Sequence, residues 1–257
     1  MIHYDCHAHV YEHINAIKDA RYIPTAPAPL SFWRQQLQKY KLKGGVLVQV
    51  SFLGTNNTEL CSALAQLDSS KFAGVAVVSP DITEQEIDRL FDAGVRGFRW
   101  NLVQGAAIPA LGSLQVKQHL NSIRERDMHI ELHLESSRLA QLICPLLDTG
   151  VTVVVDHFGL PAEPDASNDP WIQAITDHKN LSRLYVKFSA PYRTPFDTLP
   201  HALAIQSRLL PDHVIWGSDW PHTQHESTVE YSHVAMDQSA LPIKSDHQAV
   251  YALYGLQ

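Results

Sequence analysis

Cysteine is scarce in this chain and is never paired. Three cysteines occur among 257 residues, at positions 6, 61 and 144, and no two of them form a CxxC motif. Disulfide-stabilised secreted domains carry more cysteines at closer spacing. We therefore expect free thiols and a reducing compartment, namely the cytoplasm.

Long apolar runs and basic clusters are also missing. No apolar run approaches the ~20 residues that a membrane helix requires, and no basic stretch followed by an apolar one opens the chain. There are 20 Lys and Arg against 27 Asp and Glu, which gives a net charge of −7. Because phosphate backbones are bound by clustered Lys and Arg, we do not expect nucleic acid as a partner. The lack of a long apolar run argues against a membrane in the same way. A small-molecule substrate is expected instead, and the sequence does not indicate an oligomeric state.

The sequence contains neither internal repeats nor a low-complexity linker, so residues 1–257 are expected to form one domain. Short β-rich apolar runs alternate with stretches that have helical spacing, which is typical of parallel strands with crossover helices. Eight such runs predict an α/β fold, a single (β/α)8 TIM barrel. They are Ile2–His9, Gly45–Val50, Phe72–Val78, Val95–Leu102, His129–Glu135, Val151–His157, Leu184–Ser189 and Val214–Asp219.

Helix signals lie between these runs. Thr83-Glu84-Gln85-Glu86 is a capping box, and Gly94 marks the end of the helix that it begins. Three further helices are expected over Glu59–Leu67 after Asn57-Thr58, Leu114–Arg126 after Ser113, and Arg138–Leu147 after Ser137, the last kinked by Pro145.

Two proline-rich segments, Tyr11–Leu30 and Gly159–Pro170, follow the first and sixth runs. Loops at the carboxyl ends of barrel strands line the mouth of the barrel. We interpret both segments as irregular walls over the active site, and the alternative for each is an inert surface loop.

The strongest local motif is Asp5-Cys6-His7-Ala8-His9 at the end of the first run. Residues two apart on a strand point to the same face, so His7 and His9 are expected to project into the barrel together. Two imidazoles on one inner face make half a metal site. The alternative is that they are ordinary polar residues at a strand end.

Three more polar groups end other runs. His133 ends the fifth, His157 the sixth and Asp219 the eighth. The carboxyl end of a barrel is where its chemistry occurs, so these positions favour an active site. Buried, hydrogen-bonded structural groups are the alternative.

The motif set as a whole resembles the amidohydrolase superfamily, in particular amidohydrolase-related family 2, with HxH on strand one, His on strands five and six, and Asp on strand eight. Four further segments narrow the resemblance to the branch of 2-pyrone-4,6-dicarboxylate lactonases. They are Gly94 to Asn101 (GVRGFRWN), Asp156 to Gly159 (DHFG), Tyr185 to Arg193 (YVKFSAPYR) and Trp216 to His222 (WGSDWPH).

The resemblance implies a hydrolase that acts on a lactone or related cyclic ester, either a small carboxylated lactone or a sugar lactone. In that family Asp219 would take a proton from water and return it to the leaving oxygen, while His7, His9 and His157 polarise the carbonyl or hold the water. Three alternatives stay open. They are a metal-dependent decarboxylase of an aromatic or enoic acid, a sugar-lactone isomerase, and a barrel that binds a small ligand without turning it over.

The resemblance leaves the metal open. Pyrone lactonases work without a metal, whereas many superfamily members bind one divalent ion. His133 with His7, His9 and Asp219 completes the ligand set of a mononuclear Zn²⁺ site. The fourth run has Arg99 and no lysine that could be carbamylated to bridge two metals, so a binuclear centre is not expected.

The substrate contacts that we expect lie at other strand ends. Arg193 is the candidate for a carboxylate clamp, because a guanidinium binds a carboxylate with two parallel hydrogen bonds. Arg99 and Tyr192 could assist, with a structural salt bridge as the alternative for Arg99. Gln49 and Ser51 could donate hydrogen bonds to the substrate. Leu160 stands where the pyrone-dicarboxylate enzymes carry an arginine, which implies the loss of one clamp for a dianion.

Overall fold

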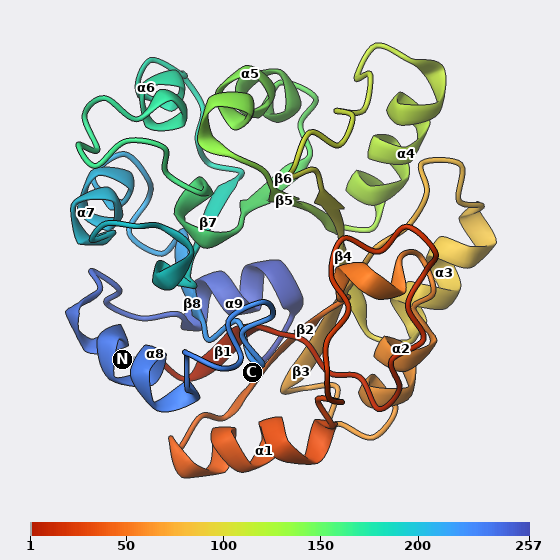
Figure 1. Cartoon of the computed structure of the whole chain (residues 1–257). Coiled ribbons are helices and arrows are strands. Elements are labelled where there is room, and N and C mark those ends of the chain that lie inside the picture. The colour runs from red at the N-terminus through yellow and green to blue at the C-terminus, as the bar shows by residue number, and fades with distance from the viewer. Residues whose placement is uncertain (1) are drawn as a thin grey trace.

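Eight parallel strands surround the centre of the molecule (Figure 1), in a computed structural model that describes residues 2–257, apart from the side chains of residues 237 and 238. The sheet follows the order of the chain, and each strand pairs in parallel with the next. The strands are β1 (Tyr4–Ala8), β2 (Gly44–Val48), β3 (Phe72–Ala76), β4 (Val95–Asn101), β5 (His129–His133), β6 (Thr152–Val155), β7 (Leu184–Ser189) and β8 (Val214–Gly217).

The ring closes where the end of β1 meets the segment that follows β8. Ala8 and Trp220 form a parallel bridge. The backbone N–H of Asp219 donates to the His7 carbonyl at 2.8 Å, and that of His9 donates to the Trp220 carbonyl at 2.7 Å. These bonds confirm the predicted barrel, and they tie the HxH motif directly to the predicted catalytic aspartate.

Helices follow the strands, and those before the last one lie around the outside of the barrel (Figure 1). They are α1 (Leu30–Lys39), α2 (Thr58–Leu64), α3 (Glu84–Asp92), α4 (Leu114–Glu125), α5 (Ser136–Leu147), α6 (Pro170–Thr176), α7 (Leu199–Gln206), α8 (Tyr231–Asp237) and α9 (His247–Tyr254), with short 3₁₀ turns at Ser51–Leu53, His157–Gly159, Pro191–Arg193 and Gln238–Ala240. Within the part of the chain that is described, no helix has the length and apolar character needed to cross a bilayer. The three cysteines are free thiols.

The predicted helix starts are met with local differences. The Thr83 hydroxyl caps α3 by accepting from the N–H of Glu86, but the Glu86 carboxylate binds Arg89, so half of the capping box forms. Ser113 caps α4. The amide of Asn57 instead bonds the carbonyls of residues 55 and 77, which ties α2 to the end of β3. The helix that was predicted to begin at Arg138 is α5, which begins two residues earlier, at Ser136.

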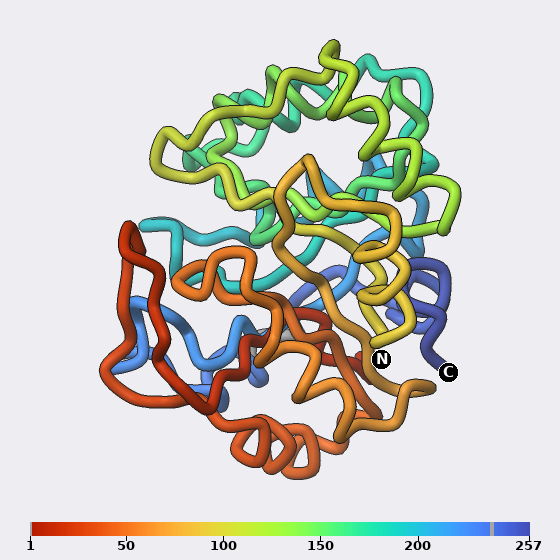
Figure 2. The backbone as a smooth tube through the Cα atoms, turned by 90° about the vertical axis from the view of Figure 1, so that its right-hand side faces the viewer, coloured from red at the N-terminus to blue at the C-terminus, as the bar shows by residue number. Residues whose placement is uncertain are grey.

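Two apolar clusters hold the layers together. The larger lies between the strands and the outer helices. The smaller joins strand side chains such as Cys6, Val46 and Ile215 to Leu253 and Tyr254 of α9, which thereby covers the amino-terminal end of the barrel. Figure 2 shows the 11–30 segment, in red, at one end of the molecule and the chain termini at the other.

Two strands end earlier than their apolar runs predict. β6 ends at Val155 and β8 at Gly217, so His157 and Asp219 lie beyond the strands. Both have left-handed backbones, with φ of 52° and 59°. A residue in that region cannot continue a strand, and such strained positions are frequent at active sites.

Gly217 gives a test of how tightly β8 packs on β1. A Cβ at this position would lie 2.5 Å from the His7 Cβ and 2.8 Å from the His7 backbone nitrogen. We expect Gly217→Ala to lower the free energy of unfolding by about 1–3 kcal/mol, because overpacking forces the backbone to move. Urea unfolding measures it. Gly112→Ala is the control, since nothing lies within 4 Å of its added Cβ. Equal stability of the two variants would contradict the tight β1–β8 contact.

Candidate active site

A cavity of about 40 Å³ opens at the carboxyl end of the strands. Seven predicted site residues line it, namely His9, Ser51, Arg99, His133, His157, Arg193 and Asp219. His7 and Tyr192 do not line it, but each lies beside one oxygen of Asp219. The structure thus gathers residues that are up to 212 positions apart around one carboxylate.

One oxygen of Asp219 faces three imidazoles. The Asp219 Oδ1 atom lies 3.5 Å from His9 Nε2, 3.6 Å from His7 Nε2 and 3.9 Å from His157 Nε2. Among the described residues, neither this oxygen nor His7 Nε2 has a hydrogen-bond partner. Because His9 Nδ1 lies 2.7 Å from the Val48 carbonyl, which can only accept, Nδ1 carries a proton and donates it there, and Nε2 is left to face Asp219.

The other oxygen of Asp219 is fully engaged. The Asp219 Oδ2 atom accepts from the Tyr192 hydroxyl at 2.7 Å and from Arg193 Nε and Nη2 at 2.8 and 2.6 Å. Burial alone would raise the pKa of Asp219, but the charge of Arg193 and the neighbouring imidazoles hold it well below 3.8. Asp219 is therefore ionised at neutral pH, and the predicted substrate clamp Arg193 binds this carboxylate.

A buried charge network lies beneath His7. Lys187 forms a close ion pair with Glu131, and its Nζ lies 3.3 Å from His7 Nδ1. Arg99 Nε donates to Asp156 Oδ2 at 2.9 Å, and Asp156 Oδ1 lies 3.3 Å from His7 Nδ1. Burial lowers the pKa of His7 well below 6.5, although Asp156 acts in the opposite direction. His7 is therefore neutral, and Arg99 forms a structural salt bridge while it also lines the cavity.

Gln49 lies away from the cavity. Its amide nitrogen donates to the carbonyls of Asn56 at 2.8 Å and Gly54 at 3.3 Å. The side chain is 2% exposed. It therefore shapes the loop after β2, which brings Ser51 to the cavity wall.

His133 stands next to His157 at the end of β5, with the ring centroids 5.0 Å apart and the planes at 88°. Burial lowers its pKa well below 6.5. Within the described chain, the potential metal ligands whose atoms lie within 4.8 Å of one another form two groups. Of the predicted ligands, neither His9 nor His133 belongs to either group. The groups are His7, His157 and Asp219, and His7, Glu131 and Asp156.

Sequence reasoning missed the other residues of the cavity wall, namely Arg21, Val50, Asn101, Val103, Gln104, Thr223 and Gln224. Asn101 could have been predicted from the sequence, because it lies two residues beyond Arg99 on the same strand and therefore points to the same face. Arg21 comes from the Tyr11–Leu30 segment, which therefore does form a wall of the site. The Gly159–Pro170 segment contributes no residue to the cavity lining.

Comparison with known proteins identifies the family to which the chain belongs. The family model described as amidohydrolase matches residues 4–253. The chain belongs to the amidohydrolase family. The predicted superfamily and barrel are thereby confirmed.

Individual relatives lie in the predicted branch. The chain is 27% identical to the 2-pyrone-4,6-dicarboxylate hydrolase of Comamonas testosteroni, over 85% of this chain and 76% of that one. It is 25% identical to the 4-sulfomuconolactone hydrolase of Rhizobium radiobacter, over 86% and 76%. The structure of a probable 2-pyrone-4,6-dicarboxylic acid hydrolase from Acinetobacter baumannii is 32% identical with a TM-score of 0.88, and all of both chains is covered.

These relatives confirm the prediction of a hydrolase of the lactonase type. A D-galactarolactone isomerase of Agrobacterium fabrum is 22% identical over 80% of this chain and 70% of its own. The structure of a 2,6-dihydroxybenzoate decarboxylase is 12% identical with a TM-score of 0.64, and it covers 99% of both chains. That likeness shows the fold alone, so the predicted decarboxylase alternative is the more distant one.

The ion pair between Arg193 and Asp219 gives a stability test. Arg193→Gln leaves a buried carboxylate uncompensated, so we expect a loss on the order of 3 kcal/mol in the free energy of unfolding at pH 7. Because the folded-state pKa of Asp219 is depressed, this stabilisation is present at neutral pH and is lost as the pH falls below about 4. Urea unfolding across this range measures both effects.

The matched control is Arg89→Gln. Arg89 and Glu86 form an ion pair whose side chains are 57% and 43% exposed. Exposed pairs contribute about 0–1 kcal/mol. A loss in Arg193→Gln no greater than in this control would show that the Asp219 charge does not depend on Arg193.

Proposed function

We propose that this protein hydrolyses a lactone that carries an anionic group, with Asp219 as the proton carrier. The observation that supports the proposal best is the set of three Nε2 atoms around the unpartnered Oδ1 of Asp219. A water molecule among these groups would meet an ionised carboxylate, which is a proton acceptor. The relatives that act on lactones agree with this chemistry.

The reaction needs one proton to be taken and later returned. Asp219 accepts a proton from water as the water oxygen attacks the lactone carbonyl carbon. The tetrahedral intermediate then collapses, the ring C–O bond breaks, and the leaving alkoxide takes the proton from Asp219. The product is a hydroxy acid. Arg193 and Tyr192 hold the carboxylate so that Oδ1 remains the free oxygen.

Charge on the carbonyl oxygen must be stabilised as it develops. We assign this to the imidazoles of His9 and His157, which line the cavity together with Arg99, and to His7, whose Nε2 lies beside the same oxygen of Asp219. Arg21 and Arg99 would also attract an anionic substituent of the substrate. The arginine that Leu160 replaces is missing, and Leu160 does not line the cavity. Arg21 does line it and supplies a cation that the sequence did not predict.

An anionic substrate also agrees with the Acinetobacter baumannii relative, whose structure holds citric acid, a tricarboxylate. That protein is 32% identical to this chain over its full length. We therefore favour a lactone with at least one carboxylate over a neutral sugar lactone, and we propose that the protein acts in the cytoplasm.

The same residues fit a divalent metal ion. His7, His157 and Asp219 offer ligand atoms within 4.8 Å of one another, and His7 Nε2 and Asp219 Oδ1 are buried without partners in the described chain. Imidazole nitrogen and carboxylate oxygen suit Zn²⁺. We propose these three as ligands, with His9 beside them. Such an ion would act as a Lewis acid on the carbonyl oxygen.

Hydrolysis can be followed as proton release from a panel of carboxylated and neutral lactones. We expect turnover of a carboxylated lactone, and a loss of kcat of at least about 10³-fold in Asp219→Asn, because the amide accepts no proton. Asp177→Asn, at an exposed position after α6, is the control and should keep full activity. Lactone turnover that survives in Asp219→Asn would exclude our assignment of the proton carrier.

Metal binding has its own test. We expect chelator-treated protein to bind zinc near one ion per chain by elemental analysis, with a rise in the melting temperature, because an ion that binds only the folded state stabilises it. His157→Asn should abolish the rise. His247→Asn, exposed at the start of α9, should not. If the protein binds no zinc and lactone turnover is insensitive to chelation, the three residues act without a metal.

A further inference from the structure

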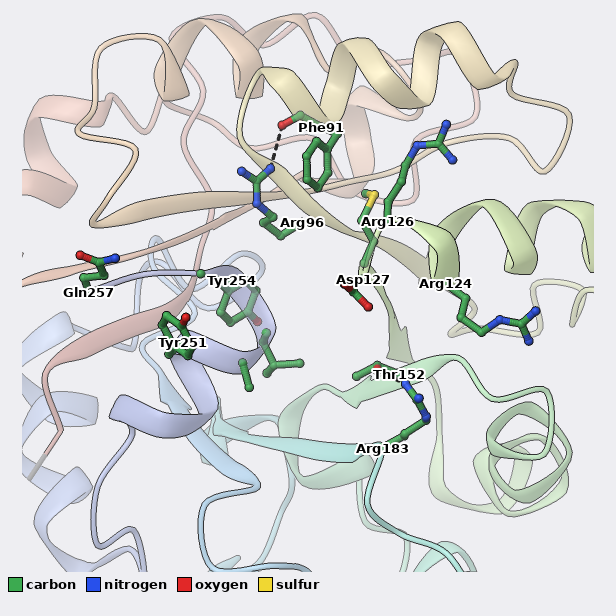
Figure 3. Close-up of a pocket in the computed structure, with 14 residues that line it drawn as sticks. Phe91, Arg96, Arg124, Arg126, Asp127, Thr152, Arg183, Tyr251, Tyr254 and Gln257 are labelled. Carbon is green, nitrogen blue, oxygen red and sulfur yellow. Dashed lines mark hydrogen bonds between the residues drawn. The ribbon is translucent and has the colours of Figure 1, made fainter.

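A second and larger cavity, of about 620 Å³, lies at the opposite end of the barrel, near the chain termini. Figure 3 shows Arg96 and Arg183 on different sides of it, with Thr152 and Asp127 between them and Tyr251 and Tyr254 of α9 along its edge. The proposed catalytic mechanism uses none of these residues.

The wall of this cavity carries cations without carboxylate partners. Arg96 donates to the carbonyls of Phe91 and Val95, at 2.7 and 2.9 Å, as the dashed line to Phe91 in Figure 3 shows in part. Arg124 donates to the carbonyl of Thr149 and to an amide oxygen, at 3.0 and 2.9 Å. Arg183 has one long contact of 3.5 Å, to a threonine hydroxyl. In the described chain, none of the three forms an ion pair.

A fourth arginine is different. Arg126 forms ion pairs with Glu84 and Asp88, at 2.9 and 2.7 Å, so its charge is balanced within the protein. Asp127 is the one acidic side chain among the described lining residues. The cavity wall therefore keeps a surplus of positive charge, in a chain whose net charge is −7.

The environment of Arg96 favours an incoming anion. Its guanidinium lies over the Phe91 ring at 4.2 Å. Burial lowers the pKa of Arg96, although Asp92 acts in the opposite direction. A partly desolvated cation gains more from a bound anion than a fully hydrated one does. Positions 96, 124 and 183 belong to separate segments, which is why no basic cluster is visible in the sequence.

From this surplus we infer a binding site for a small phosphorylated metabolite at the base of the barrel. Guanidinium groups bind phosphate oxygens through paired hydrogen bonds. The volume is far greater than the roughly 40 Å³ of the active-site cavity, and it is sufficient for a nucleotide-sized molecule. The ring of Tyr251, which is 61% exposed, offers an apolar surface beside the cations.

Calorimetric titration of the full chain with ADP and with pyrophosphate tests this site. We expect saturable binding of at least one of the two at constant ionic strength. Arg183→Gln and Arg124→Gln should each weaken the binding by about tenfold, because each removes a charge-assisted hydrogen bond. Both arginines are exposed, so an unchanged melting temperature should verify that the variants fold.

Arg34→Gln is the matched control, because it removes the same charge from an exposed position on α1 away from the cavity. It should bind both probes like the original chain. Binding that is lost in Arg21→Gln but kept in Arg183→Gln would place the anion at the active site and overturn the inference. The absence of saturable binding of either probe would overturn it as well. Lactone turnover is measured separately, so failure here leaves the proposed function standing.

Discussion

The buried negative charge of Asp219 is the constraint on which the rest of the site depends. A carboxylate with no solvent exposure is stable only when cations and donors surround it. Arg193 and Tyr192 satisfy one oxygen, and this leaves the other as the acceptor among the imidazoles. The backbone at Asp219 is also strained, with φ of 59°, so the chain departs from the strand conformation of β8 at this residue. Stability and reactivity thus come from the same arrangement.

The charged side chains beneath the site are likewise buried and paired with one another. Lys187 and Arg99 balance Glu131 and Asp156 in the interior of the barrel. Burial raises the pKa of Glu131 to about 7, with Asp156 acting in the same direction and Lys187 against it. A hydrophobic set of the same volume would hold the strands together as well. The polar set instead fixes the ring of His7 from below, so that its Nε2 meets Asp219.

The features that could be predicted from the sequence were those that follow from the periodicity of its apolar residues. The eight apolar runs identified the barrel, and their polar ends identified His133, His157 and Asp219. Periodicity could not predict which side chains form hydrogen bonds with one another. Nothing local indicates that Arg193 binds Asp219 instead of a substrate, because that contact depends on how β7 and β8 lie side by side. For the same reason Gln49, a reasonable substrate donor by position, bonds its own loop.

The two ends of the barrel differ in what the fold demands of them. At the carboxyl end, parallel strands deliver their last residues to one point, so residues remote in sequence converge on Asp219. At the amino end, α9 closes the barrel through Leu253 and Tyr254, and polar residues there are free of the requirement to form a core. Arg96, Arg124 and Arg183 bond only neutral oxygens there, so the structure uses their hydrogen bonds but does not balance their charges. Their lack of carboxylate partners in an acidic chain is therefore better explained by a ligand than by stability.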